Sequence, residues 1–322
     1  MGEQMKKLSV MLLAGFLLLT AISIPGNLYA ENNKIAVMWV GKSGMTNLVL
    51  MGFLQRARVI APNMEIKLKR ELKDMQEAET AFREFEATKD GIVFLRSTGA
   101  EFLAKADPKI PCFVGGCNNP SYLGTIKNLN EPEGKITGVT YYIPYDQIFR
   151  VMLTLFPNTR SVGILLEKGH PGAAIDQEGT RAQCQQLNLA YNEVLASNRE
   201  QLIEGAKKLS GQVDLFIISN TALAMDNTVS LLAVANSTKT PIFSFAEKPV
   251  QAGAAVGIVA DDVKLGSMLA DSVVDVVINR KPVSKVPVKT DPEPKILINQ
   301  SMMQGLGLQF PQAILEKAQL IK

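Results

Sequence analysis

The hydrophobic pattern of the chain alternates between short apolar runs and longer amphipathic segments. Short apolar runs predict buried strands, and segments with apolar residues three and four positions apart predict helices. Strand–helix alternation with continuously apolar strands is typical of a parallel sheet covered by helices on both faces. In the first half, strands are expected at 34–40, 64–72, 91–97 and 110–114, and helices at 45–61, 74–88 and 99–106.

The same alternation begins again after residue 160. Strands are expected at 160–167, 189–196, 213–219, 241–245 and 254–260, and helices at 175–188, 199–211, 222–238 and 264–280. Two consecutive units of similar size predict an α/β protein with two similar doubly wound parallel-sheet lobes around a ligand cleft. The joint between the units is expected within 137–147, and a connector rich in Pro and Lys follows at 281–295.

The first 30 residues have the pattern of a secretory signal peptide. Lys6 and Lys7 precede an apolar run from Val10 to Ile24, and Ala30 supplies a small residue at the expected cleavage point. A membrane anchor is the alternative, but the run is shorter than the roughly 20 residues that span a bilayer. We therefore expect residues 1–30 to be removed and the mature chain to act in the periplasm.

The composition restricts the classes of function. The net charge is +3, and basic residues are scattered among acidic ones without aromatic interleaving, so no nucleic-acid partner is expected. With one histidine and no CxxC, a protein-held metal is not expected either. Cys112 and Cys117 are expected as buried thiols, with a disulfide between them as the alternative. Because GxSxG, Walker and GxGxxG motifs are also missing, the sequence favours a binding protein without cofactors over an enzyme.

Candidate ligand contacts lie where the predicted strands end, because open parallel sheets bind ligands beyond the carboxyl ends of their strands. In RSTGA, Ser97 and Thr98 precede a predicted helix, so their hydroxyls and the helix N–H groups could bind an anion such as a carboxylate. Plain N-capping is the alternative role for both. Trp39 and Tyr142 are the aromatic candidates, with packing in a core or at the joint as the alternative. The candidate ligand-binding residues are Trp39, Ser43, Ser97, Thr98, Asn118, Asn119, Tyr142, Asn220, Glu247 and Asp261.

Several segments in this order and spacing resemble the ABC-transporter substrate-binding protein family whose characterised members include tryptophan- and tyrosine-binding proteins. They are DGIVFLRSTGA, FVGGCNNPSYLG, GKITGVTYYIPYDQ, DLFIISNTALAMDN and VGIVADDVKLG. The resemblance implies a type I periplasmic binding protein fold with three crossovers between its lobes. It assigns 31–142 plus 252–283 to lobe one and 143–251 plus 284–322 to lobe two. The sequence departs from the family pattern at Asn119 and Asn220, which replace aspartates, and at Asp262, which replaces a tyrosine.

The resemblance also implies a function. We expect a monomeric periplasmic substrate-binding protein of an ABC importer, which binds an amino acid or related carboxylate by hinge closure and then docks on a membrane permease. A sugar or nucleoside receptor is the alternative ligand class. A ligand-sensing partner of a membrane sensor kinase, or an exported enzyme on the same architecture, would be a different class of protein.

Overall fold

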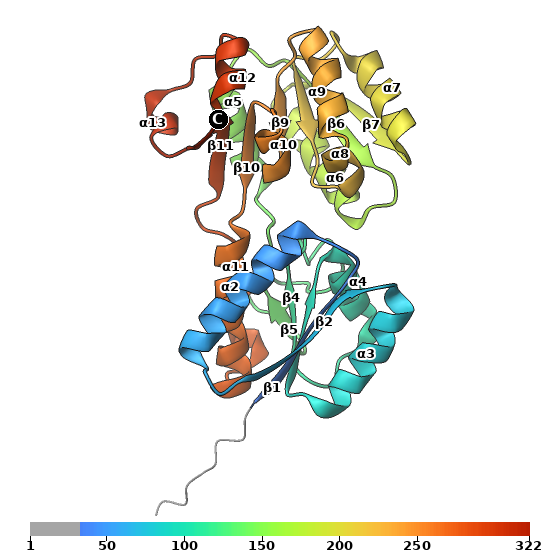
Figure 1. Cartoon of the computed structure of the whole chain (residues 1–322), viewed down its shortest axis with the longest axis vertical. Helices are drawn as coiled ribbons and strands as arrows, with labels where there is room; N and C mark the ends of the chain where they lie inside the picture. The colour runs from blue at the N-terminus through green and yellow to red at the C-terminus, as the bar shows by residue number, and fades with distance from the viewer. Residues whose placement is uncertain (1–32) are drawn as a thin grey trace, which may run out of the picture. The chain divides into compact units, whose positions relative to one another are not determined.

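The computed structural model describes residues 33–322, so the predicted signal peptide lies outside the described residues. These residues form two sheets, which define the first and second lobes (Figure 1). The first sheet has the strand order β2-β1-β3-β4-β5, and all its pairings are parallel. Its elements are β1 (Lys34–Val40), α2 (Gly44–Ile60), β2 (Glu65–Leu72), α3 (Met75–Thr88), β3 (Gly91–Leu95), α4 (Ser97–Ala106), β4 (Cys112–Gly115) and β5 (Ile136–Gly138).

The second sheet has the order β12-β11-β10-β9-β8-β6-β7, and only the pairing of β10 with β11 is antiparallel among the described strands. Its strands are β6 (Ser161–Glu167), β7 (Ala190–Ala196), β8 (Leu215–Ile218), β9 (Ile242–Ser244), β10 (Val256–Val259), β11 (Lys295–Asn299) and β12 (Gln319–Ile321). The helices beside it are α5 (Tyr145–Leu155), α6 (Pro171–Gln186), α7 (Arg199–Leu209), α8 (Ala222–Asp226), α9 (Thr228–Ser237), α10 (Glu247–Gln251), α12 (Gln300–Gly305) and α13 (Gln312–Leu315).

The alternating elements expected from the hydrophobic pattern are present, but several boundaries differ: α4 begins at Ser97 rather than at residue 99, and α6 begins at Pro171 rather than at residue 175. The helix expected over 222–238 is interrupted at Asn227, where α8 ends and α9 begins. The helix expected over 264–280 already begins at Asp262 as α11 (Asp262–Val273), and it continues into the π-helical turn η1 (Val274–Ile278). Asp261 causes the earlier start, because its carboxylate accepts hydrogen bonds from the N–H groups of Val263 and Lys264.

The boundaries expected for the lobes are wrong in the last third of the chain. β10 lies between β9 and β11 in the second sheet, so the chain enters the first lobe only after β10 and not at residue 252. It also stays there beyond residue 283 and the 3-10 turn η2 (Val283–Lys285). Thr137 donates to the carbonyl of Val286, and Lys289 N–H donates to the carbonyl of Gly138. The connector rich in Pro and Lys pairs with the first lobe through backbone hydrogen bonds, which do not depend on side-chain hydropathy. The hydrophobic pattern therefore could not show where the chain returns to the second lobe.

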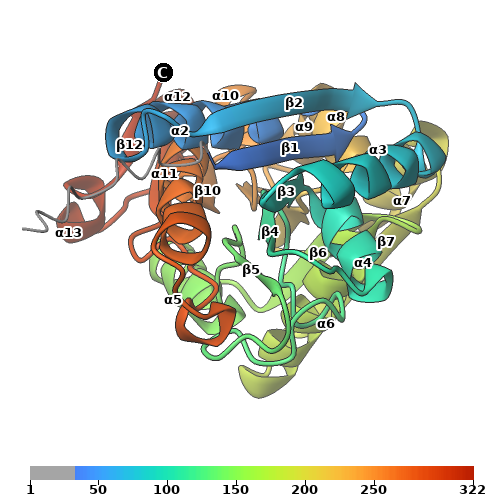
Figure 2. The same ribbon diagram turned by 90° about the horizontal axis from the view of Figure 1, so that it is seen from below.

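Two apolar layers cover the faces of the first sheet (Figure 2). Residues on one face of β1, including Val37 and Trp39, pack against α2 and α11. Those on the other face, including Met38, pack with Phe82 and Phe85 of α3. The cysteines, Cys112, Cys117 and Cys184, are buried free thiols, so the alternative of a disulfide is not adopted. Among residues 33–322, every helix is too short or too polar to cross a bilayer.

Glycines bring α2 and α11 into direct backbone contact, although more than two hundred residues of sequence separate the two helices (Figures 1 and 2). A Cβ atom at Gly266 would lie 2.0 Å from the carbonyl oxygen of Val49, and one at Gly52 would lie 1.9 Å from that of Val263. Real Cβ atoms do not approach backbone so closely, so only glycine fits at either position. Leu265 and Leu269 of α11 share a buried core with residues of α2.

We predict that Gly266→Ala lowers the free energy of unfolding by about 2–3 kcal/mol, because the added methyl group forces two packed helices apart. Urea denaturation of the variant and the parent chain measures this difference. Gly305→Ala is the matched control, since Gly305 also lies in a helix but has no atom within 4 Å of an added Cβ. Equal stability of the two variants would show that the α2–α11 contact does not constrain the fold.

Candidate ligand-binding site

A cavity of about 760 Å³ lies between the two lobes, at the carboxyl ends of the parallel strands. The first lobe contributes the loops that follow β1, β3 and β4, and the second lobe contributes the start of α6 and the loops that follow β8 and β9. The cavity volume falls within the range of about 300–1,000 Å³ that is typical of small-molecule sites. The position also agrees with the rule that ligands bind beyond strand carboxyl ends in parallel sheets.

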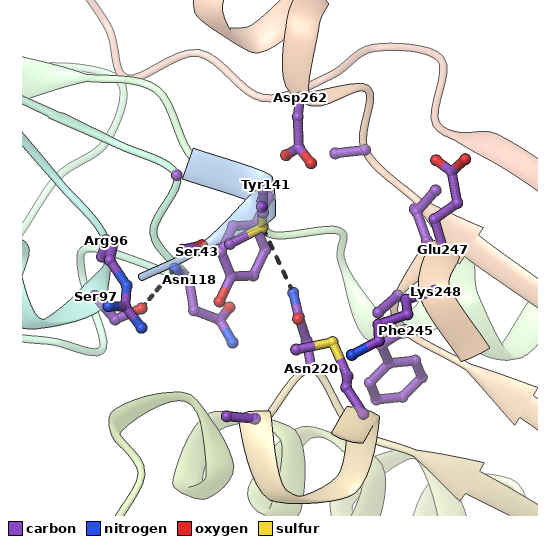
Figure 3. Close-up of a pocket in the computed structure, with 18 of the residues that line it drawn as sticks. Ser43, Arg96, Ser97, Asn118, Tyr141, Asn220, Phe245, Glu247, Lys248 and Asp262 are labelled. Atoms are coloured by element: carbon purple, nitrogen blue, oxygen red, sulfur yellow. Dashed lines mark hydrogen bonds between the residues drawn. The ribbon is translucent and has the colours of Figure 1, made fainter. Parts of the chain in front are cut away.

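Most of the residues predicted from sequence come together at this cavity. Those that line it are Ser43, Ser97, Thr98, Asn118, Tyr142, Asn220 and Glu247. They originate from both lobes, and they are adjacent only because the two sets of strand ends face the same cavity (Figure 3).

Three predicted residues lie elsewhere, because each has a structural role. Trp39 is 0% exposed in the core of the first lobe. The carboxamide of Asn119 accepts hydrogen bonds from backbone N–H groups of the turn that follows it, and it reaches the cavity only through a hydrogen bond with Tyr142. Asp261 caps α11 and forms an ion pair with Lys295 at 3.0 Å.

The first-lobe side of the cavity is built to receive an anion. Arg96, Ser97 and Thr98 stand at the N-terminus of α4, and we call these residues the anion corner. Thr98 Oγ1 is buried and has no hydrogen-bond partner among residues 33–322. Arg96 donates a hydrogen bond to the carbonyl of Val40, and its backbone has φ 75°, a conformation that costs about 1–3 kcal/mol in a residue with a side chain. Free helix N–H groups, a guanidinium and an unpaired hydroxyl together favour a carboxylate.

Other predicted residues of the first lobe support this corner. Ser97 Oγ accepts a hydrogen bond from the N–H of Asn118 at 3.1 Å, which fixes the loop after β4 against α4 (Figure 3). Ser43 accepts from the N–H of Thr46 at 3.2 Å and so caps α2. Ser43 thus caps a helix, whereas Ser97 holds a loop instead of capping α4, and both residues still line the cavity.

A buried carboxylate joins the two lobes beside the cavity. Asp176, 3% exposed, accepts hydrogen bonds from the Tyr145 hydroxyl at 2.7 Å, from Asn118 Nδ2 at 3.3 Å and from the N–H of Asn220 at 3.4 Å. Burial raises the pKa of Asp176 to about 6, although these hydrogen bonds oppose the increase. Because Asn118 belongs to the first lobe and Asp176 to the second, this contact depends on how the lobes are positioned.

Asp262, the first residue of α11, points its carboxylate into the cavity (Figure 3). The structure gives it no hydrogen bond or ion pair with any residue of the described chain, 33–322. Burial raises its pKa to about 7, and the negative charges of Asp261 and Glu247 add to that effect, whereas Lys295 opposes it. The cavity thus contains a carboxylate whose charge no protein group balances by direct contact.

Apolar and aromatic side chains form the second-lobe wall of the cavity. Phe245 packs edge to face on Tyr145, with ring centroids 5.9 Å apart, and Tyr145 in turn contacts Tyr142 at 6.0 Å. Met225 of α8 lines the cavity on this side and Met45 of α2 lines it from the first lobe, and their thioethers adapt readily to a ligand's shape. An apolar or aromatic group of a ligand would be buried against this wall.

Several of these residues were missed by sequence reasoning. Arg96 precedes Ser97 in the quoted RSTGA segment, and Asp262 was noted only as a departure from the family pattern, so both carried a usable signal. Asp176 lies inside a predicted helix, where nothing marks it. His170 is half-buried, lines the cavity and caps α6 by accepting from the N–H of Gly172. Residues 33–322 contain no cluster of His, Cys, Asp or Glu that could hold a metal ion.

Two parallel-sheet lobes with a polar and aromatic cavity between them define a ligand-binding protein with the type I periplasmic binding protein fold. Residues 54–322 match the model of the ABC transporter substrate binding protein family, and the chain belongs to this family. The family is one of substrate-binding transport proteins rather than enzymes.

Individual relatives support the assignment at lower similarity. The chain is 24% identical to the tyrosine-binding protein of Clostridioides difficile (strain R20291) over 248 residues, which cover 77% of this chain and 72% of the relative. Among solved structures, it is similar to an ABC domain from Streptococcus pneumonia in complex with L-Trp, with a TM-score of 0.77 and 21% identity over 90% of this chain and 100% of the other. A conserved domain protein from Vibrio cholerae matches with the same TM-score and identity over 91% of this chain and 100% of the other.

We predict that Asp262→Asn stabilises the ligand-free protein by up to about 4 kcal/mol at pH 8, the free energy that corresponds to the rise in the pKa of Asp262 on folding. The folded-state pKa of about 7 lies above the ordinary aspartate value of 3.8, so ionised Asp262 opposes folding, and the cost in free energy grows as the pH rises from 4 to 8. The gain from the variant should therefore vanish near pH 4. Denaturant unfolding at both pH values measures it.

Asp271→Asn is the control for this measurement, because Asp271 lies on the same helix but forms an exposed ion pair with Arg56. Its loss should change stability by less than about 1 kcal/mol. If Asp262→Asn were destabilising at pH 8, the carboxylate would have a stabilising partner that its surroundings do not reveal.

Proposed function

We propose that this chain is the substrate-binding protein of an ABC importer and that it binds an amino acid or a closely related carboxylate between its lobes. The observation that carries the proposal is the anion corner. A ligand carboxylate there would accept hydrogen bonds from the free N–H groups of α4 and from the unpaired hydroxyl of Thr98, close to the positive charge of Arg96. Each of these donors is already in place without the ligand, which favours binding.

The opposite wall supports an apolar or aromatic side chain on the ligand. Phe245, Tyr145 and Met225 of the second lobe offer a surface for such a group, and Met45 of α2 adds to it from the first lobe. Similarity to a tyrosine-binding protein and to a domain solved with L-Trp points in the same direction. Tyrosine and tryptophan are therefore the first ligands to test.

Closure of the lobes is the proposed mechanism. Because the cavity is lined from both lobes, a ligand makes its full set of contacts only when the lobes are close together. It therefore binds the closed arrangement better and shifts the population toward it. Asn118 and Asp176, which hydrogen-bond across the lobes, would be among the contacts that report this change.

The cellular setting follows from the family and from the predicted signal peptide. We propose that the mature chain is periplasmic, works without a cofactor and delivers its ligand in the closed form to a membrane permease. Uptake of radiolabelled ligand by cells with and without the gene tests import. Unchanged uptake, with binding intact, would favour a sensing role.

Ligand class is tested by thermal unfolding of the mature chain with a panel of amino acids, sugars and nucleosides. A ligand at a hundredfold excess over its Kd should stabilise the fold by about 2.7 kcal/mol. We expect stabilisation by L-tyrosine, L-tryptophan or another amino acid. Stabilisation by sugars or nucleosides alone would overturn the proposed ligand class.

We predict that Thr98→Val weakens binding of the amino acid found in that panel about tenfold, through loss of one hydrogen bond to a charged group. The fold should keep its stability, because valine has the same shape and the hydroxyl has no protein partner. Isothermal titration calorimetry measures the affinity. Thr180→Val is the matched control, since Thr180 Oγ1 is likewise buried without a partner but lies away from the cavity. Equal affinity of both variants would remove Thr98 from the site.

A further inference from the structure

The unpaired state of Asp262 is unusual because cations are plentiful around it. Lys295 is 3.0 Å from Asp261, Lys264 is 2.7 Å from Asp291, and Lys248 is 2.6 Å from Asp226. Each of these lysines is therefore engaged by another carboxylate. An ionised carboxylate that is largely withdrawn from water and lacks a partner is costly, so such a group is typical of a functional site.

Tyr141 lies between Asp262 and the anion corner. The Tyr141 side chain hydrogen-bonds to Ser97 of the anion corner and is close enough to Asp262 to be influenced by its charge. Figure 3 shows Tyr141 between these groups, with Arg96 and Ser97 on one side and the Asp262 carboxylate on the other. A small ligand with its carboxylate in the anion corner would lie along Tyr141, and a neighbouring substituent would face Asp262.

The charge of Asp262 determines which substituent suits this place. A protonated amine would form an ion pair in surroundings that exclude much of the water, where such pairs are strong. A hydrogen or an alkyl group would leave the carboxylate unpaired, and a second carboxylate would be repelled. Glu247 is the other carboxylate near this end of the cavity, but Gln251 already donates to it at 2.8 Å.

We propose that Asp262 binds a protonated amine of the ligand, so that the cavity selects amino acids over carboxylates of the same shape that lack an amine. This inference rests on the proposed function, which places the ligand carboxylate in the anion corner.

A linked release of protons follows. With its pKa raised to about 7 by burial, Asp262 is about half protonated in the free protein at pH 7. An ammonium group favours the ionised form, so binding releases about half a proton at pH 7, and affinity falls as the pH decreases from 8 to 6. The charged groups around Asp262 are Asp261, Lys295, Glu247 and the phenol of Tyr141. Asp176, whose pKa is raised to about 6 by burial, and His170, whose pKa is lowered by burial, also line the cavity, so the variant below is needed to isolate Asp262.

The test compares L-tryptophan with 3-(indol-3-yl)propanoate, and L-tyrosine with 3-(4-hydroxyphenyl)propanoate, by calorimetry on the mature chain. Each pair differs only in the amine. We expect the parent protein to bind the better amino acid about 100-fold more tightly than its deaminated analogue. Asp262→Asn should lose most of that preference and the proton release, measured in buffers of different ionisation enthalpy. Asp271→Asn, on the outer side of the same helix, should retain both.

The outcomes separate the two proposals. If the deaminated analogue binds the parent protein as tightly as the amino acid, the amine site is overturned while the carboxylate site stands. If Asp262→Asn keeps the preference, the amine is bound by another residue and this inference fails. If neither member of either pair binds, and no other amino acid in the panel does, the proposed function fails and this inference fails with it.

Discussion

The architecture depends on the contact between α2 and α11, in which backbone meets backbone because Gly52 and Gly266 have no side chains. The chain reaches α11 from β10 in the second sheet and leaves the first lobe only after Lys289. The chain therefore crosses between the lobes three times: after β5, after β10 and after Lys289. The last two crossings exist because α11 packs against α2 in the first lobe. The same contact fixes the start of α11, where Asp262 faces the cavity. A packing constraint far from any ligand thus determines where one of the site's charges lies.

Three strained or unpaired groups lie at the cavity, whereas Trp39 Nε1, Thr46 Oγ1 and Thr180 Oγ1 are buried without a partner elsewhere in residues 33–322. Arg96 has a strained backbone, Thr98 Oγ1 lacks a hydrogen-bond partner and Asp262 lacks a counter-ion. Each lowers the stability of the ligand-free protein, and the two unpaired groups, Thr98 Oγ1 and Asp262, are of the kind that a ligand with complementary groups would satisfy. Asp176 differs, because protein groups already satisfy its carboxylate, and its hydrogen bond with Asn118 links the two lobes.

Hydrophobic periodicity predicted most strands and longer helices, because central strands such as β1, β3 and β8 are buried along nearly their full length. It did not predict short elements such as β5 and β12. It could not predict the crossings, since the segment around Lys289 pairs through its backbone alone. Strand-end topology correctly led to Ser97, Thr98 and Asn118 as cavity residues. The same rule misplaced Trp39, whose side chain follows the alternation of β1 toward α2 and α11. Asp176 could not be found at all, because its significance arises from Asn118 in the other lobe.

The burial of Trp39 has a consequence for spectroscopy. It is the single tryptophan of the chain, it is 0% exposed, and its indole N–H has no hydrogen-bond partner among the described residues. Its fluorescence should be that of an indole in an apolar, rigid environment, and it should shift to longer wavelength when the first lobe unfolds. The second lobe contains no such fluorophore, and the cavity lies outside the contacts of Trp39. Emission from this residue is thus a reporter of the integrity of one lobe.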